Sequence, residues 1–135
     1  MVDSDEYQRW RSEGDRALRS ADLQANAGLH NWACFSAEQA AQLGLKGLLH
    51  GVGAAAWGHD LEQLAQRARD QGLIMSQEIA DAFRRLGRLY IPSRYPDSHA
   101  AGDPASHFAA SDAEAAMRDA GDVLSWVDEC WEELQ

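Results

Sequence analysis

The 135-residue chain carries 22 acidic and 12 basic side chains, a formal net charge of −10, and 45% hydrophobic residues. This length suits one domain, residues 1–135, and the hydrophobic content is too high for a disordered chain. An acidic surface repels nucleic acid at long range, which excludes indiscriminate nucleic-acid binding but leaves room for a local basic site.

The sequence contains neither a membrane-spanning segment nor a secretory signal. No apolar run approaches the roughly 20 residues that cross a bilayer, and Met1–Glu6 is acidic without an apolar stretch. We therefore expect a cytoplasmic protein without membrane contact. Cys34 and Cys130 have no Cys or His neighbour at metal-ligand spacing. We expect both cysteines to be buried, and we expect no metal and no other cofactor.

Three–four spacing of apolar and small residues predicts two long helices in the first half of the chain. The first runs from about Asp5 to Asn26, before a glycine. The second runs from about Asn31 to Val52. Small residues on this second helix would let another helix approach closely, although glycine lowers helix propensity; they are Ala37, Ala40, Ala41, Gly44 and Gly47.

Two shorter helices should follow. One is expected to start near Gly58 or His59, with Asp60 in its first turn, where an acidic side chain suits the helix dipole. The next should begin after Ser76, a good N-cap, and end at Pro92.

Residues 92–110 hold all three prolines of the chain and predict a loop, with room for a short helical turn. The last helix is expected to open with a capping box, in which Ser111 is the N-cap and Glu114 stands three residues later. No segment shows strand alternation. The predicted fold is therefore all-α, a five-helix up-and-down antiparallel bundle with four main helices and one short helix.

Charge is distributed unevenly along the chain. Residues 111–135 contain eight acidic side chains and one basic side chain, whereas residues 84–94 contain no acid and four arginines, Arg84, Arg85, Arg88 and Arg94. One interpretation is a solvated helix face that pairs with the acidic last helix. The other is an anion site, because the arginine fork matches phosphate geometry.

Arg94 and His99 are separated by four residues in the proline-containing loop. Cleavage of RNA without a metal needs these two groups, since arginine neutralises charge on the phosphate and histidine moves a proton near neutral pH. The pattern is short, and a solvated loop histidine is the alternative interpretation. Asp97, between the two, could also pair with Arg94 and occupy it.

Several blocks of sequence, kept in order, resemble the HEPN family (higher eukaryotes and prokaryotes nucleotide-binding). The first helix resembles the start of that domain. The later blocks are Ala37–Ala41 with Leu45–Leu49, similar to "A-x-Q-A-A-E-x-x-L-K-A-L-L"; Gly58–Leu61, matching "G-H-D-L"; Leu89–Asp97, matching "Y-x-x-x-R-Y-P-D"; and Asp112-Ala113 with Ala116 and Ala120, similar to the opening of the last helix. The match covers nearly the whole chain and points to the branch with an R-Y-P-D signature.

This resemblance implies a homodimeric five-helix bundle. Many members with an R-x4-6-H motif are metal-independent endoribonucleases, often toxins paired with a nucleotidyltransferase-like antitoxin. By resemblance, Arg94 and His99 would be the catalytic residues and would face their counterparts across a dimer groove. Histidine would assist attack of the ribose 2′-hydroxyl, and arginine would stabilise the charged transition state.

The sequence also departs from that pattern. Some toxins carry a tyrosine, modified by the partner enzyme, where this chain has Ala101. R-Y-P-D members often lack a histidine at the position of His99. The alternative is a non-catalytic module that binds a nucleotide or a nucleotidyltransferase-like partner, and a third interpretation is a plain interaction domain. Candidate residues for RNA or nucleotide binding at this basic site are Arg85, Arg88, Arg94, Tyr95 and Asp97.

Three kinds of residue have a structural interpretation beside a functional one. His59 would cap or pack against a helix start, or else act near the site. Lys46, the only lysine, would extend from an interface. The tryptophans are expected to be core or dimer anchors rather than base-stacking platforms; they are Trp10, Trp32, Trp57, Trp126 and Trp131.

Overall fold

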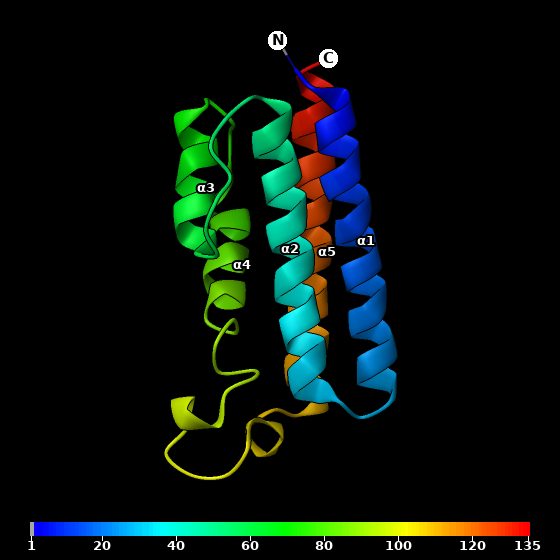
Figure 1. Ribbon diagram of the computed structural model, residues 1–135, viewed down its shortest axis with the longest axis vertical. Coiled ribbons are helices and arrows are strands. Elements are labelled where there is room, and N and C mark those ends of the chain that lie inside the picture. The colour runs from blue at the N-terminus through cyan, green and yellow to red at the C-terminus, as the bar shows by residue number, and fades with distance from the viewer. Residues whose placement is uncertain (1) are drawn as a thin grey trace.

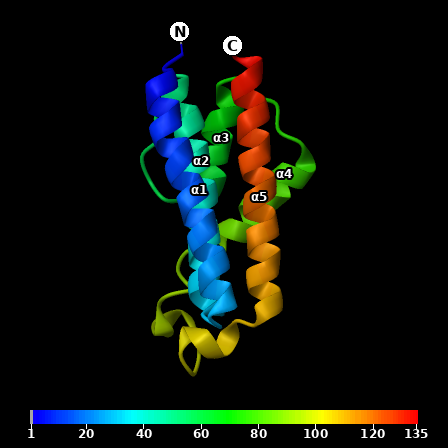
Figure 2. The ribbon, with the colours of Figure 1, turned by 90° about the vertical axis from the view of Figure 1, so that its right-hand side faces the viewer.

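The computed structural model describes residues 2–135, and within this range the chain forms helices and no strand. The elements are α1 (Ser4–Asn26), α2 (His30–Gly51), α3 (Leu61–Asp70), α4 (Gln77–Gly87), the 3-10 turns η1 (Pro96–Ser98) and η2 (Pro104–His107), and α5 (Ala110–Glu133). The long helices α1, α2 and α5 lie side by side, and α3 and α4 lie along one side of α2 (Figures 1 and 2). The predicted all-α five-helix bundle is confirmed. Met1, part of the segment expected not to be a signal, lies outside the described residues.

Glycines of α2 allow α1 and α5 to approach closely. A Cβ atom placed on Gly47 would lie 3.0 Å from Cβ of Trp10 and 3.2 Å from backbone atoms of Tyr7 and Arg11. Side chains of α5 cover Gly44 and Gly51 in the same way. The prediction that small residues permit close packing of α2 is confirmed, and α2 is the most enclosed helix of the bundle.

Residues near the two ends of the chain join α1 to α5. The rings of Tyr7 and Trp131 stack with centroids 4.1 Å apart. Asp128 accepts hydrogen bonds from Oη of Tyr7 at 2.9 Å and from Nε and Nη2 of Arg11 at 2.8 and 3.0 Å. Both ends of the chain therefore lie at one end of the bundle, and the loop between α4 and α5 lies at the other (Figure 1).

The bounds of α3 and α4 differ in part from the prediction. Asp60 lies before α3 as its N-cap, where its carboxylate accepts the N–H groups of Glu62 and Gln63 at 3.0 and 3.2 Å. The prediction that Asp60 stands in the first turn was wrong, because a capping carboxylate must precede the donors it accepts. Ser76 caps α4 as predicted.

The predicted end of α4 at Pro92 was also wrong, since α4 ends at Gly87. Glycine has low helix propensity, and a proline disfavours helical geometry at the residue before it. The chain continues in turns held by hydrogen bonds such as Ser93 N–H to Leu89 O at 3.2 Å. The expected short helical turn in the loop is present as η1 and η2.

The predicted cap of α5 was wrong by two residues. The backbone N–H of Ala109 donates to the carboxylate of Asp112 at 2.8 Å, so α5 begins at Ala110. Ser111 and Glu114 therefore lie inside the helix. From sequence Ser111 was the better candidate, since alanine has no side-chain acceptor; in the structure the helix starts earlier, and only the acidic half of a capping box, Asp112, is used.

Both cysteines are buried and free, as predicted. Burial raises the pKa of the Cys34 thiol to about 12 and that of Cys130 to about 11. Among residues 2–135, no three His, Cys, Asp or Glu side chains are grouped to hold a metal ion. None of the helices in this range is long and apolar enough to cross a membrane.

The tryptophans differ in burial, and the only lysine is largely buried. Trp126 and Trp131 are in the core as expected, whereas Trp57 is exposed. Lys46 is only 8% exposed, and burial lowers the pKa of its amine. The sole lysine is thus largely buried within the protomer.

Candidate functional site

The predicted site residues lie at the loop end of the bundle, opposite the chain termini (Figure 1). After α4 the chain turns twice, with Tyr95 N–H donating to Ile91 O at 3.2 Å. Nδ2 of Asn31, a buried residue at the start of α2, donates to Ser93 O at 3.0 Å. These hydrogen bonds fix the backbone on both sides of Arg94.

Arg94 lies within a cage of aromatic rings. Its Cζ is 4.1 Å from the ring centre of Phe35, 4.6 Å from that of Tyr90 and 4.8 Å from that of Tyr95. Its Nε and Nη2 donate to Tyr90 O at 3.0 and 2.9 Å. Within residues 2–135 Arg94 forms no ion pair and Nη1 donates no hydrogen bond. The guanidinium is therefore held in place while part of its donor edge stays available.

A buried carboxyl group, Glu38 on α2, belongs to the same end of the molecule. Its oxygens accept from Nε2 of Gln39 at 2.7 Å and from Nε2 of Gln42 at 2.9 Å. Burial raises the pKa of Glu38 to about 7, although those two hydrogen bonds and the charges of Arg94 and Lys46 act in the opposite direction. Of these two cations, the caged Arg94 lowers the pKa of Glu38 more than Lys46 does.

Sequence reasoning missed Glu38 and Gln42. The signal that was present is a polar stripe at spacing of four, Glu38, Gln42 and Lys46, on a helix otherwise rich in small and apolar residues. A buried polar stripe of this kind requires partners from other elements, and the structure supplies one of them from the segment before α3.

That partner is His59, which links the α2 stripe to the aromatic cage. Its Nδ1 lies 2.8 Å from Oε1 of Gln42. Because Nε2 of Gln42 donates to Glu38, we assign Oε1 as an acceptor; Nδ1 then carries the proton and Nε2 is the unprotonated nitrogen of a neutral ring. The ring also stacks on Tyr90, with centroids 5.4 Å apart. Tyr90 thus lies between His59 and Arg94.

A cavity of about 450 Å³ opens beside this cage. It is lined by apolar groups of Leu61, Tyr90 and Ile91, with His59 and Arg88 on its walls. Arg88 is exposed and forms neither an ion pair nor a side-chain hydrogen bond within residues 2–135. The volume falls in the range of about 300–1,000 Å³ that small-molecule pockets occupy.

The remaining arginines of the basic stretch are paired. Nε and Nη2 of Arg85 both donate to the carboxylate of Asp119 on α5 at 2.9 Å. Arg84 pairs with Asp81 at 2.7 Å. The interpretation that this face pairs with the acidic last helix therefore holds for Arg85, whose donors are already used there.

His99 lies in a different cluster from Arg94. Its Nε2 is 2.7 Å from Pro92 O, which can only accept, so Nδ1 is the unprotonated nitrogen of the neutral ring. Its ring stacks on that of His107 with centroids 4.0 Å apart. Within the described protomer no hydrogen bond or ring contact joins His99 to Arg94, and Asp97 forms no ion pair with Arg94.

Similarity to known proteins agrees with this architecture. The sequence model of the HEPN domain matches residues 7–130. The crystal structure of TT1696 from Thermus thermophilus is 36% identical, with a TM-score of 0.87 over 92% of this chain and 97% of that chain. The chain belongs to the HEPN family. An archaeal HEPN homologue, ST0689, is 28% identical with a TM-score of 0.74, covering 91% of this chain and 95% of that chain.

A HEPN domain protein from Thermotoga maritima shares the fold at 22% identity, with a TM-score of 0.73 over 92% of this chain and 98% of that chain. No curated protein sequence shows significant similarity to the chain. Three HEPN-like blocks of the sequence meet in the structure, because α2 supplies Glu38 and Gln42, the block before α3 supplies His59, and the block after α4 supplies Tyr90 and Arg94. Membership of the R-Y-P-D branch stays a prediction.

Proposed function

We propose that this HEPN protein binds a nucleotide at the loop end of the bundle, with Arg94 and Arg88 contacting phosphate. The observation that carries the proposal is the caged guanidinium of Arg94, which forms no ion pair within the described residues and stacks on Tyr90, a residue that lines the cavity together with Arg88. A guanidinium held in position by rings and by a carbonyl loses little freedom when it binds phosphate. Because the chain as a whole is acidic, these cations attract phosphate only at short range.

The cavity suits the rest of a nucleotide. Leu61, Ile91 and the Tyr90 ring offer an apolar surface for a base. His59 contributes an unprotonated Nε2 as an acceptor, because its Nδ1 is bound to Gln42. Two acidic side chains, Asp60 and Glu62, also line the cavity, and the carboxylate of Asp60 is engaged in capping α3.

Calorimetric titration with adenosine and guanosine mono- and triphosphates tests this proposal. Arg94→Ala and Arg88→Ala should each weaken binding by about 10–100-fold, the effect of losing a hydrogen bond to a charged group. Arg19→Ala removes the same charge from an exposed position on α1 and should leave affinity unchanged. Absence of heat with every nucleotide, or an equal loss in Arg19→Ala, would contradict the proposal.

A second candidate function is metal-independent RNA cleavage of the toxin type, which the fixed tautomer of His99 favours. Nδ1 of His99 would take the proton of a ribose 2′-hydroxyl as that oxygen attacks the adjacent phosphorus. The bond from phosphorus to the 5′-oxygen then breaks to leave a 2′,3′-cyclic phosphate, the 5′-oxygen takes a proton from water, and Arg94 neutralises the charge that develops on the phosphate. Since the two side chains lie in separate clusters of one protomer, this reaction draws them from two copies across a dimer groove.

Cleavage of RNA in the presence of EDTA separates the two candidates. If the enzyme proposal holds, His99→Ala and Arg94→Ala each reduce the rate by about 100-fold or more, as removal of a general base or of a charge-stabilising donor does. Arg19→Ala again serves as the control. Nucleotide binding without cleavage would leave only the binding function.

The proposed homodimer rests on apolar side chains exposed around the cage. Trp32 is 42% exposed and packs on Phe35, a ring of the cage, and Tyr95, which contacts Arg94 directly, is 47% exposed. Such groups suit an interface beside the site. Sedimentation equilibrium should give twice the 14.9 kDa of one chain, and Trp32→Glu should lower that mass while Trp57→Glu does not. A monomeric wild type would contradict the dimer.

The family resemblance further suggests a nucleotidyltransferase-like antitoxin as partner in the cytoplasm. Ala101 stands where some toxins carry the tyrosine that such a partner modifies, so inhibition here would have to use another contact. Co-expression with the product of a neighbouring nucleotidyltransferase gene should give a stable complex on gel filtration. Separate elution of the two proteins would speak against this pairing.

A further inference from the structure

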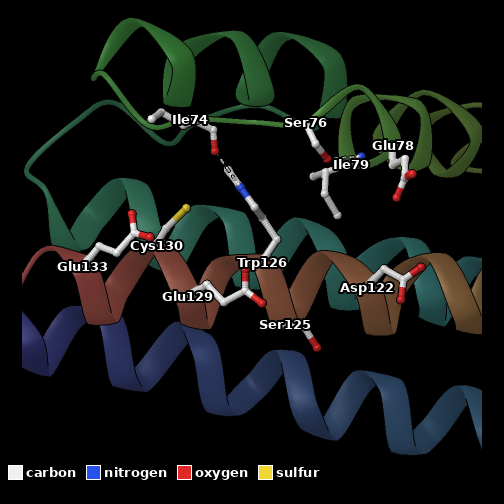
Figure 3. A pocket seen from close by; sticks show the side chains of 10 residues that line it. All are labelled: Ile74, Ser76, Glu78, Ile79, Asp122, Ser125, Trp126, Glu129, Cys130 and Glu133. Carbon is white, nitrogen blue, oxygen red and sulfur yellow. Dashed lines mark hydrogen bonds between the residues drawn. The ribbon is translucent and has the colours of Figure 1, made fainter.

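A second cavity, of about 540 Å³, lies between α5, the segment that joins α3 to α4, and the start of α4 (Figure 3). Its apolar part is formed by Ile74, Ile79 and Trp126. Ile74 is 86% exposed, the highest value among the large apolar residues. Nε1 of Trp126 donates to Ile74 O at 2.9 Å, which holds the joining segment against α5. We call this cavity the α5 groove.

Carboxylates without cationic partners surround the α5 groove. Glu78 comes from α4, and Asp122, Glu129 and Glu133 come from α5 (Figure 3). None of the four forms an ion pair within residues 2–135. Arg85 lies close enough for Asp122 to act on its charge, but its guanidinium is bound by Asp119. The groove is therefore a place of uncompensated negative charge.

A buried thiol completes the lining. Cys130 is 6% exposed, and its sulfur forms no hydrogen bond within the described residues. Figure 3 shows this side chain pointing from α5 toward the joining segment. Cys130 and Trp126 form the apolar floor beside the exposed Ile74, and an apolar side chain placed there would remove the Ile74 surface from water, which is favourable.

We propose that the α5 groove binds a basic, amphipathic segment of a partner protein, whose arginine or lysine side chains pair with these carboxylates while an apolar side chain covers Ile74 and Ile79. Nucleic acid and anionic lipid surfaces are repelled by the same charges. Along α5, Asp122, Glu129 and Glu133 are spaced by about 10 and 6 Å at the helical rise of about 1.5 Å per residue. Cations one turn apart on a partner helix match the shorter of these distances.

The α5 groove is separate from the nucleotide site. Its α5 residues belong to the half of the helix near the chain termini, whereas Arg94 lies at the loop end (Figure 1). A partner bound in the groove would therefore leave the cage and its cavity open. This proposal stands even if the proposed nucleotide binding fails.

Binding of a synthetic helical peptide with leucine and arginine at three–four spacing tests the proposal, with a glutamate-for-arginine analogue as comparison. We expect the basic peptide alone to bind, with amide and indole NMR shifts confined to Ile74, Ile79 and Trp126. Glu129→Gln with Glu133→Gln should weaken binding by tenfold or more, about 1.4 kcal/mol. Ile74→Ser should weaken it as well.

The matched control is Glu114→Gln with Glu132→Gln, which removes the same charge from α5 outside the groove and should leave affinity unchanged. An equal loss in this control, or an unaffected Ile74→Ser variant, would show unspecific attraction and overturn the proposal. Binding of spermidine but not of the peptide would assign the groove to a small polyamine instead. Loss of dimer mass in the Glu129→Gln, Glu133→Gln variant would assign it to a second copy of this chain.

Discussion

Glu38 shows how one side chain can make stability depend on pH. Burial raises its pKa from 4.5 to about 7. Between these values the unfolded chain releases the proton while the folded protein retains it, so the contribution of Glu38 to stability is complete below about pH 4.5 and is lost as the pH rises through about 7. The pH range in which this happens includes neutral conditions.

Glu38→Gln should therefore flatten the pH dependence of the free energy of unfolding. The wild type loses up to about 3 kcal/mol from this group between about pH 5 and about pH 8, at roughly 1.4 kcal/mol per pKa unit, and the variant does not. Urea denaturation of both proteins across this range gives the comparison. Parallel curves would show that Glu38 titrates normally in the folded state.

Residues of the candidate site were predictable from sequence only in part. The motif positions Arg94 and His99 were visible, but the cage around Arg94 comes from α2 and from the turns after α4, which spacing within a loop does not reveal. Likewise Arg85 was a candidate for anion binding because Asp119, its partner, lies 34 residues away in sequence. Pairing across helices depends on how the helices face each other, and periodicity does not encode that.

At the scale of the element, the start of α5 depends on one side chain. Asp112→Ala removes the acceptor for the N–H of Ala109 and should lower the free energy of unfolding by about 1 kcal/mol. Ser111→Ala should change it by only a few tenths of a kcal/mol, because that hydroxyl is not the cap. Thermal and urea unfolding distinguish the two variants. A larger effect of Ser111→Ala than of Asp112→Ala would show that Ser111 is the N-cap, as the sequence predicted.

The close approach of α1 to α2 gives a second test at this scale. Gly47→Ala places a methyl group 3.2 Å from two backbone atoms of α1, which must move, at a cost of about 1–3 kcal/mol. Gly121→Ala on α5 meets no atom within 4 Å and should stabilise by up to about 1 kcal/mol through helix propensity. The two changes are chemically identical, so opposite shifts in unfolding midpoint would isolate packing from propensity. Equal shifts would contradict the tight contact.

The sequence predicted the presence of each helix far better than the residues at which the helices begin and end. Apolar spacing over several turns predicted all five helices, because burial of one face is what stabilises a helix in a bundle. Ends depend on single hydrogen bonds, as at Asp60 and Asp112, where more than one residue offers a suitable acceptor. The end of α4 at Gly87 was missed because the proline that stops a helix lay further along the chain.

At the scale of the whole molecule, Asp128 joins the first helix to the last. Burial alone would raise its pKa, but hydrogen bonds from Arg11 and Tyr7 outweigh burial and leave that pKa lowered. Its contribution to stability is therefore present above the ordinary carboxyl pKa of about 3.9 and is lost as the pH falls through the lower folded value.

Asp128→Ala should lower the free energy of unfolding by about 1–3 kcal/mol at neutral pH, since it leaves Tyr7 and Arg11 without this acceptor. The difference from wild type should shrink in acid. Glu132→Ala, a change of the same charge on the same helix without an ion pair among the described residues, should have little effect. A cost that is independent of pH would mean that the packing of the side chain, and not its charge, is what matters.

The enclosed position of Lys46 has a consequence for chemical probing of the whole molecule. It is the only lysine in the sequence, and the residue is only 8% exposed between α2 and its neighbours. Acylating reagents, acetyltransferases and amine-directed cross-linkers should therefore modify this lysine side chain only slowly while the bundle is closed. The rate at which Lys46 becomes labelled would therefore measure how often the fold opens and exposes the central helix α2.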